Sequence, residues 1–337
     1  MGFTVYSSTD SGAPSLTGLT GSLLSVLDAI LVDGYGSKIA AGWTRPFPAT
    51  SSYGTYKLGN GTTASLFVYD AGSGSQAGAE ALMTGWNSID SIEGGRVTGS
   101  NPYPAYANLN IGFGRVGNYG AVVLRKSTAT TAVARSWIAF ADSASLYFFT
   151  KPADPATFAN NRWSAFFFGD MYSFRSGSAD IGRCMIIGRV NPSSSAVADD
   201  RMDVINQVGG GIATPVTGHF AAHLCAGGSG SITLCKTGDS SKAVNSSVLT
   251  GTVPFLNPCD NGLYISPVWL VDAGFANVRG KLRGFWHVLH ASGSLADGAV
   301  ITGSSDFPNR TFQVVASSAN AAMYLIETSD TLDTNYP

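Results

Sequence analysis

The stretch Ser164-Ala165-Phe166-Phe167-Phe168-Gly169-Asp170 places three phenylalanines in succession immediately before a Gly-Asp turn signal. Successive side chains of a β-strand point to opposite faces, so Phe166 and Phe168 share one face and Phe167 takes the other. We therefore predict a strand that ends at Phe168 and is covered on both faces. The cover can be the protein's own core or a neighbouring subunit, because aromatic residues are also enriched at interfaces.

Further strands are predicted on both sides of this stretch, in a region that also holds Tyr147, Phe148, Phe149, Trp163, Tyr172 and Phe174. Runs rich in β-branched and aromatic residues are separated by turn residues. The predicted strands are 53–58, 65–69, 121–125, 136–141, 146–150, 164–168 and 184–190, with a hairpin turn at 59–61. This pattern predicts a mainly β (α+β) fold with an antiparallel sheet or sandwich.

Two short helices are expected in the N-terminal part. Apolar residues from Leu23 to Val32 follow helical spacing, with Ser22 as the N-cap and Gly34 as the terminating residue. A second helix is predicted from about Gln76 to Ile89, where alanine and leucine favour helix. The first apolar run is too short to cross a bilayer, so no membrane role is expected.

The polar segment 191–195, Asn-Pro-Ser-Ser-Ser, predicts a domain boundary. The expected division is an α+β domain with aromatic-rich antiparallel strands at 1–192 and a second β-rich domain at 193–337. In the second domain, strands are predicted at 231–237, 263–271, 284–290 and 311–316.

The chain carries unusually little charge. Charged residues make up 12% of the 337 residues, against about 25% in an ordinary globular protein, and the formal net charge is −2. Such a balance provides no strong field for nucleic acid or anionic lipid. Because a net charge near zero favours association, we expect a subunit that buries surface against copies of itself or other proteins.

The cysteines, Cys184, Cys225, Cys235 and Cys259, are scattered through the second half of the chain. In a chain of this length they are expected to be buried, reduced thiols of a protein made in the cytosol. The first residues lack a basic segment before an apolar run, so no signal peptide is expected.

Gly112-Phe113-Gly114-Arg115-Val116-Gly117 matches the dinucleotide-binding pattern G-x-G-x-x-G. That motif works because a helix begins directly after the glycines and holds the pyrophosphate. Here a predicted strand follows, so we interpret the match as chance in a glycine-rich chain and expect no cofactor.

His219, His223 and Cys225 form the densest group of potential zinc ligands, with Cys235 further along the chain. Two histidines four residues apart can share a helix face, but glycine and proline on either side leave little room for a helix. The alternative is a buried strand or turn with hydrogen-bonded imidazoles, and no metal is expected.

Other candidate groups are also better explained without catalysis. Asp199, Asp200 and Asp203 lie near the start of a possible short helix, whose N-terminus carboxylates stabilise. A calcium or glycosidase site would need partners that the sequence does not place. His287 and His290 are attributed to packing beside Trp286. We therefore expect no enzyme.

Short runs of sequence carry a further signal, in this order: Val5–Asp10, Leu23–Leu27, Gly34–Lys38, Ala40–Thr44, Arg135–Asp142, Leu146–Phe149, Phe167–Phe174, Met185–Arg189, Gly262–Tyr264, Arg279–Trp286 and Ile326–Asp330. Together they resemble a family of tailed-bacteriophage virion structural proteins, although residues 193–255 contribute little. The resemblance implies a virion component, made in the host bacterial cytoplasm, without a catalytic motif.

The resulting expectation is a multi-copy protein of the phage tail, collar or baseplate that binds itself and neighbouring virion proteins. The alternative is a receptor- or glycan-binding tip module that contacts the host surface. Candidate sugar-binding residues for it are Asn101, Tyr103, Tyr106, Asn108 and Asn110. A cell-wall hydrolase would need an acid or metal set that the sequence does not display.

Overall fold

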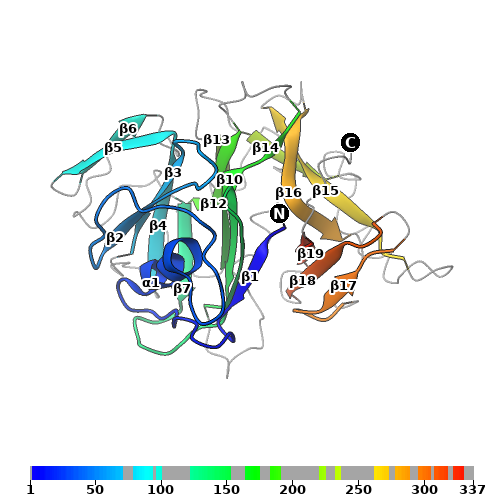
Figure 1. Ribbon diagram of the computed structural model, residues 1–337, viewed down its shortest axis with the longest axis horizontal. Helices are drawn as coiled ribbons and strands as arrows, with labels where there is room; N and C mark the ends of the chain where they lie inside the picture. Colours follow the sequence, from blue (N-terminus) through cyan, green and yellow to red (C-terminus); the bar gives the residue numbers. More distant parts are fainter. Residues whose placement is uncertain are drawn as a thin grey trace.

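The computed structural model describes residues 2–70, 79–93, 96–100, 122–152, 164–174, 183–190, 220–224, 232–236, 262–272, 278–288, 295–304, 307–317 and 322–329. Within these residues the protein is mainly β, with one α-helix that continues as a short π-helix. Its strands form two large antiparallel sheets and a separate hairpin (Figure 1). The predicted fold class is therefore confirmed.

The first sheet has the strand order β1-β8-β9-β10-β12-β7-β4-β3-β2, and β13 also pairs with β12. Its strands are β1 (Thr4–Ser7), β2 (Tyr53–Lys57), β3 (Ser65–Tyr69), β4 (Ala79–Trp86), β7 (Val122–Ser127), β8 (Trp137–Ala141), β9 (Ser145–Thr150), β10 (Ser164–Asp170), β12 (Cys184–Val190) and β13 (Phe220–Leu224). The strands predicted between residues 53 and 190 are all present, with ends within two residues of the prediction.

The first predicted helix is present as α1 (Ser22–Asp28), which continues into η1 (Ala29–Asp33). It ends at Gly34, as predicted, where φ is 79°, a left-handed value that glycine adopts without steric cost.

The prediction that Ser22 caps this helix was wrong. The N-cap is Gly21, and the Ser22 hydroxyl donates to the Thr17 carbonyl instead. The Leu23 N–H is satisfied by Asp70 Oδ2 at 2.8 Å, a residue beyond the end of β3. A capping group supplied by tertiary structure cannot be recognised from the helix sequence alone.

The second predicted helix was also wrong, because most of the segment 76–89 forms β4, which pairs with β3 on one side and β7 on the other. Ala81 and Met83, two residues apart, both enter the core, which is strand spacing. The helix propensity of alanine is worth well under about 1 kcal/mol per residue, so pairing on two sides outweighs it.

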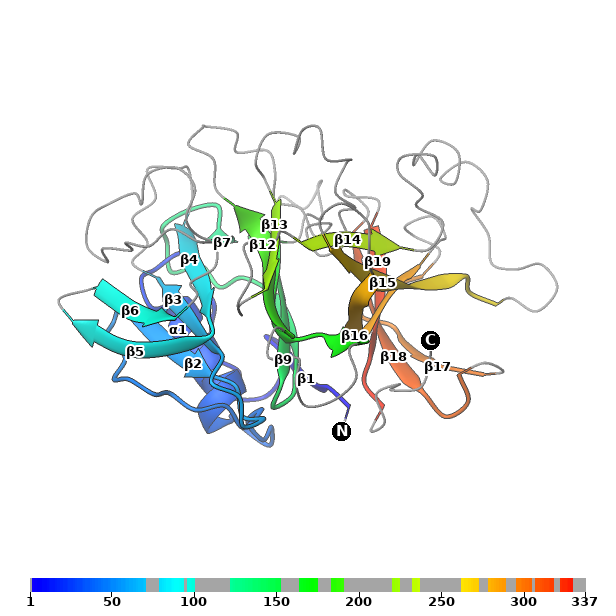
Figure 2. The same cartoon turned by 90° about the horizontal axis from the view of Figure 1, so that it is seen from above.

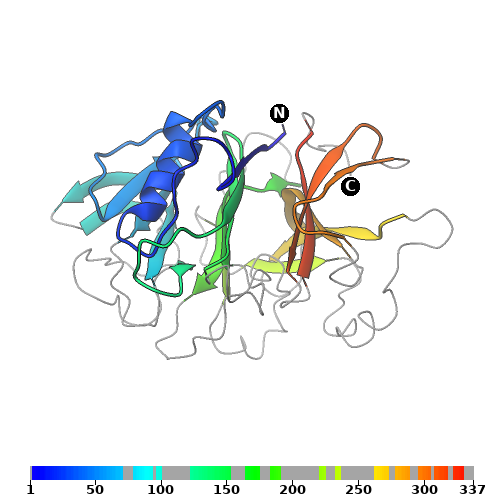
Figure 3. The same ribbon diagram turned by 90° about the horizontal axis from the view of Figure 1, so that it is seen from below.

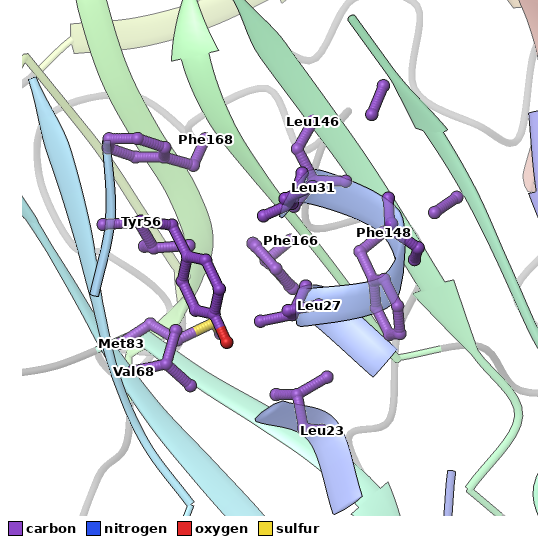
Figure 4. Close-up of a cluster of buried hydrophobic side chains, with 14 of the residues drawn as sticks. Leu23, Leu27, Leu31, Tyr56, Val68, Met83, Leu146, Phe148, Phe166 and Phe168 are labelled. Atoms are coloured by element: carbon purple, nitrogen blue, oxygen red, sulfur yellow. The ribbon is translucent and has the colours of Figure 1, made fainter. Parts of the chain in front are cut away.

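The first sheet curls around α1. Leu23, Leu27 and Leu31 of the helical segment lie between β2–β4 on one side and β8–β10 on the other (Figure 4). Phe166 and Phe168 enter this core from β10. The helix thus occupies the concave side of the sheet (Figure 3).

The opposite face of β8–β10 packs against the second sheet. Phe167, Tyr147 and Phe149 form one core with residues of that sheet, including Phe285 and Tyr324. The central strands therefore lie between the helix side and the second sheet (Figure 2). The prediction that both faces of the aromatic strand are covered is confirmed, with Phe166 and Phe168 on one face and Phe167 on the other.

The second sheet has the order β14-β15-β16-β19-β18-β17, and β11 also pairs with β16. Its strands are β11 (Tyr172–Ser173), β14 (Ile232–Lys236), β15 (Ile265–Asp272), β16 (Val278–Val288), β17 (Val300–Thr302), β18 (Thr311–Ser317) and β19 (Ala322–Glu327). Its face away from the first sheet carries a further apolar cluster around Trp286, Phe312 and Leu325. The hairpin of β5 (Ser88–Glu93) and β6 (Arg96–Ser100) forms a small core with Phe67 and Trp86 of the first sheet.

Two strand pairings cross the predicted boundary between residues 192 and 193. β13 pairs with β12 in the first sheet, and β11 pairs with β16 in the second. Each sheet thus contains a strand from the other side of the boundary. The division into two domains at this boundary stays a prediction.

Candidate functional site

Polar side chains gather where the turn between β8 and β9 meets β16. Arg283 holds Asp142 through two contacts, Nη2 to Oδ2 at 2.8 Å and Nη1 to Oδ1 at 3.3 Å. Asp142 Oδ1 also accepts the backbone N–H groups of Ala144 and Ser145, each at 2.8 Å. Because Arg283 belongs to the second sheet and Asp142 to the first, this ion pair fastens the two sheets together.

Asp170, at the end of β10, extends this group. Its Oδ2 accepts from Asn60 Nδ2 at 2.7 Å and forms an ion pair with Arg183 Nε at 2.7 Å. Ser145 Oγ links the two parts, since it donates to the Asp170 carbonyl and accepts from Arg283 Nη1, both at 3.0 Å. We call these residues the junction cluster: Asn60, Asp142, Ser145, Asp170, Arg183 and Arg283.

Burial controls the electrostatics of Asp170, which is only 5% exposed. Loss of hydration raises the pKa of the Asp170 carboxyl, although Arg183 and Arg283 act in the opposite direction. Ionisation of this carboxyl therefore carries a cost in free energy that its two guanidinium neighbours only partly offset.

Gly169 makes the junction cluster possible by allowing β10 to approach the neighbouring turn. Its φ is 143°, and a Cβ at this position would collide with the backbone of Ala144 and Ser145. Glycine is the residue that tolerates both the conformation and the close approach.

The contacts of the junction cluster connect the two sheets and differ from those of a catalytic centre. The Ser145 hydroxyl is held between Arg283 and the Asp170 carbonyl, whereas a serine nucleophile needs an adjacent base. Asp142 and Asp170 are each bound to a guanidinium group. Among the described residues, no group of three or more His, Cys, Asp or Glu side chains is placed to hold a metal ion.

A second buried ion pair lies under the start of α1. Lys126 and Asp70 are in direct contact, and both side chains are fully buried. Lys126 Nζ also donates to the Leu19 carbonyl at 2.7 Å and to Ser22 Oγ at 3.2 Å. Burial raises the pKa of Asp70 and lowers that of Lys126, each against the attraction of its partner. This pair positions the helix that the first sheet surrounds.

The outer face of the second sheet carries an aromatic group, which we define as Tyr172, Phe174 and Trp269. Phe174 contacts both other rings, with centroid distances of 5.8 Å, and is 41% exposed. Lys281 pairs in register with Tyr172 and with Trp269, and its Nζ lies 5.3 Å from the Tyr172 ring centroid. This cation over the Tyr172 ring stabilises the position of that ring. The Phe174 ring is partly accessible.

The structure places few of the site candidates taken from the sequence. His223 lies in β13 and Cys235 in β14, and His287 lies in β16. Because β13 is extended, it does not provide the helix face considered for the His219–His223 pair. Outside the described residues lie His219, Cys225, Cys259, His290, the glycine motif 112–117, Asp199, Asp200, Asp203 and the tyrosines and asparagines of 101–110. Of the predicted buried cysteines, Cys184 is confirmed as buried.

The junction cluster was missed in the sequence, although one signal was available. The strands predicted at 136–141 and 164–168 are each followed by an aspartate, Asp142 and Asp170. β8 and β10 both pair antiparallel with β9, so they run in the same direction and end on the same side of the sheet. This arrangement brings the two carboxylates together. The role of Arg283, more than a hundred residues away, had no local signal.

No protein-family model matches the sequence, and no curated protein matches it. In the described part of the chain, no helix combines the length and apolar character that crossing a bilayer would require.

Proposed function

We propose that this protein is a structural component of a tailed-bacteriophage virion, present in many copies. In this role it binds copies of itself and neighbouring particle proteins in the tail, collar or baseplate. The proposal includes no catalytic activity, cofactor, nucleic acid or membrane.

The observation that carries the proposal is the position of the sequence runs that resemble phage virion proteins. Arg135–Asp142 contains β8, and Leu146–Phe149 lies within β9. Phe167–Phe174 contains the end of β10 and all of β11, while Arg279–Trp286 lies within β16. These strands face one another across the shared core, and Asp142 and Arg283 join them. These four runs therefore include residues that hold the two sheets together, as expected if the resemblance reflects a common scaffold.

The low charge of the chain supports an assembled state. Some of the few charged residues pair with each other within the protein. These buried or half-buried ion pairs include Asp70–Lys126, Asp142–Arg283 and Asp170–Arg183. A surface poor in charge tolerates burial against neighbours because few ions must be desolvated.

A virion assay tests this proposal. Antibodies against the recombinant protein are used to probe gradient-purified phage particles by immunoblot and by immunogold electron microscopy. We expect the protein to co-purify with particles, in many copies by gel densitometry, with gold at the tail or its junction with the head. Absence from particles of a strain that expresses the protein would overturn the proposal.

The aromatic group favours a second candidate, a receptor- or glycan-binding tip module. The partly exposed Phe174 ring beside Tyr172 and Trp269 offers apolar faces of the kind that line ligand sites. A tip protein would be present in few copies per particle. In addition, Phe174→Ala would abolish adsorption of the protein to host cells while Val133→Ala, a change at another exposed apolar residue, would not.

A further inference from the structure

We propose that the outer edge of β17 is a self-association surface, at which β17 of a second copy adds antiparallel to the second sheet. This inference rests on the proposed function and specifies the self-association that the function includes. β17 lies at the end of the strand order and forms an outer border of the second sheet (Figure 1).

The hydrogen-bond register shows which backbone groups face outward from this edge. Ala299 O accepts from Val314 N at 2.8 Å, and Gly303 N donates to Arg310 O at 2.7 Å. Since hydrogen-bonded pairs alternate along an antiparallel ladder, Ile301 is bonded to β18 and the residues on either side of it are not. The N–H and C=O groups of Val300 and Thr302 therefore point away from β18, and neither residue has a hydrogen bond within the described part of the chain.

The border strands β1 and β2 of the first sheet differ from β17, because outward backbone groups on them are hydrogen-bonded. On β1, the outward Val5 carbonyl accepts from Lys38 Nζ, and the outward Ser7 N–H donates to Asp10 Oδ2. On β2, Lys57 exchanges two backbone hydrogen bonds with Thr44. Natural sheets usually protect their borders in such ways because an open strand edge recruits another strand.

The side chains of β17 also favour addition of a strand. Val300 is 65% exposed and Thr302 is exposed, while Ile301 packs against the apolar cluster of the second sheet. β-Branched residues favour extended backbone, and the strand contains neither the lysine nor the proline that commonly blocks pairing.

A second copy fits this edge because the edge is self-complementary. A two-fold axis through Ile301 places Val300 of one copy opposite Thr302 of the other, and the reverse. Both residues present outward N–H and C=O groups, so each of these two pairs exchanges two hydrogen bonds. So few bonds give a weak contact in solution, which many copies in one particle would reinforce.

Charge substitution tests the surface. Sedimentation velocity of the full chain over a range of concentrations should show reversible dimers, which Val300→Lys/Thr302→Lys removes by placing lysines opposite each other. The control Ser25→Lys/Val133→Lys adds the same charge at exposed positions elsewhere and should associate like the parent. Equal melting temperatures would confirm that all three proteins are folded.

Cysteine cross-linking tests the register. A mixture of Val300→Cys and Thr302→Cys proteins should form disulfide-linked dimers on mild oxidation, because hydrogen-bonded pairs have Cα atoms about 5.5 Å apart. Either protein alone should not, since identical residues lie too far apart across the axis. Peptide mapping would identify the 300–302 linkage among any formed by native cysteines.

The outcomes separate this inference from the proposed function. Dimers that persist in the double-lysine variant, or a parent that stays monomeric at all concentrations, overturn the inference. A monomeric parent whose lysine variant fails to enter particles would instead indicate that β17 receives a different virion protein. Absence from particles with intact β17-dependent dimers would overturn the virion function alone.

Discussion

Phe166 and Phe167 are adjacent in β10, yet their rings belong to different hydrophobic cores. The Phe166 ring stacks on Phe148 with centroids 5.6 Å apart, in the core around α1. The Phe167 ring lies 4.6 Å from that of Tyr147, in the core between the two sheets. One strand thus joins the helix side of the protein to the second sheet.

We therefore expect Phe166→Ala and Phe167→Ala each to lower the free energy of unfolding by about 3–5 kcal/mol, because each leaves a cavity in a closed core. Chemical denaturation monitored by circular dichroism measures the loss. Val133→Ala, at an exposed position, should change stability by less than about 0.5 kcal/mol. A Phe167→Ala protein as stable as the parent would show that the second sheet does not seal this face.

Asp70→Ala should destabilise the protein by about 3–5 kcal/mol, because it leaves the fully buried Lys126 without its counter-charge. The double variant Asp70→Leu/Lys126→Met should recover most of that loss, less about 1 kcal/mol for the uncapped Leu23 N–H. Denaturation of Asp70→Leu, Lys126→Met and the double variant forms the required cycle. Losses that simply add would contradict direct coupling of the two residues.

Arg283→Lys should weaken the contact between the sheets although it keeps the charge, because an ammonium cannot make the paired contacts of a guanidinium with Asp142. A double-mutant cycle of Arg283→Gln and Asp142→Asn, in which each change removes a charge, should give a coupling of about 1.5–3 kcal/mol, above the ~0.2–1 kcal/mol of exposed pairs. Equal stability of Arg283→Lys and the parent would show that this ion pair contributes no more than an exposed surface pair.

Asp170 should give the protein a distinct dependence on pH. Its folded pKa is raised above the ordinary 3.8, so the folded state binds the proton more tightly than the unfolded state. The stabilisation from this group is complete below the unfolded pKa and is lost as the pH rises through the folded pKa.

Asp170→Asn removes that dependence and retains an acceptor for Asn60 and Arg183. Urea denaturation of both proteins at a series of pH values should show the stability of the parent relative to the variant falling as the pH rises. A relative stability that rises with pH would mean that attraction to the arginines, rather than burial, sets the direction of the Asp170 pKa shift.

The sequence alone determined the strands with strong local signals and their two buried faces. Alternation along a strand is a property of the backbone, so the run Phe166-Phe167-Phe168 was sufficient to assign each ring to a face. The same is true of the end of the first helix at Gly34, since a left-handed residue there needs no tertiary partner.

Tertiary structure decided what local preference left undetermined or opposed. Residues 79–86 form a strand because β3 and β7 pair with them on both sides, which outweighs their helix propensity. The cap of α1 comes from Asp70, and the junction between the sheets needs Arg283 beside Asp142. These contacts join residues far apart in the chain, so no local pattern encodes them, and only the folded backbone brings the charges within reach of each other.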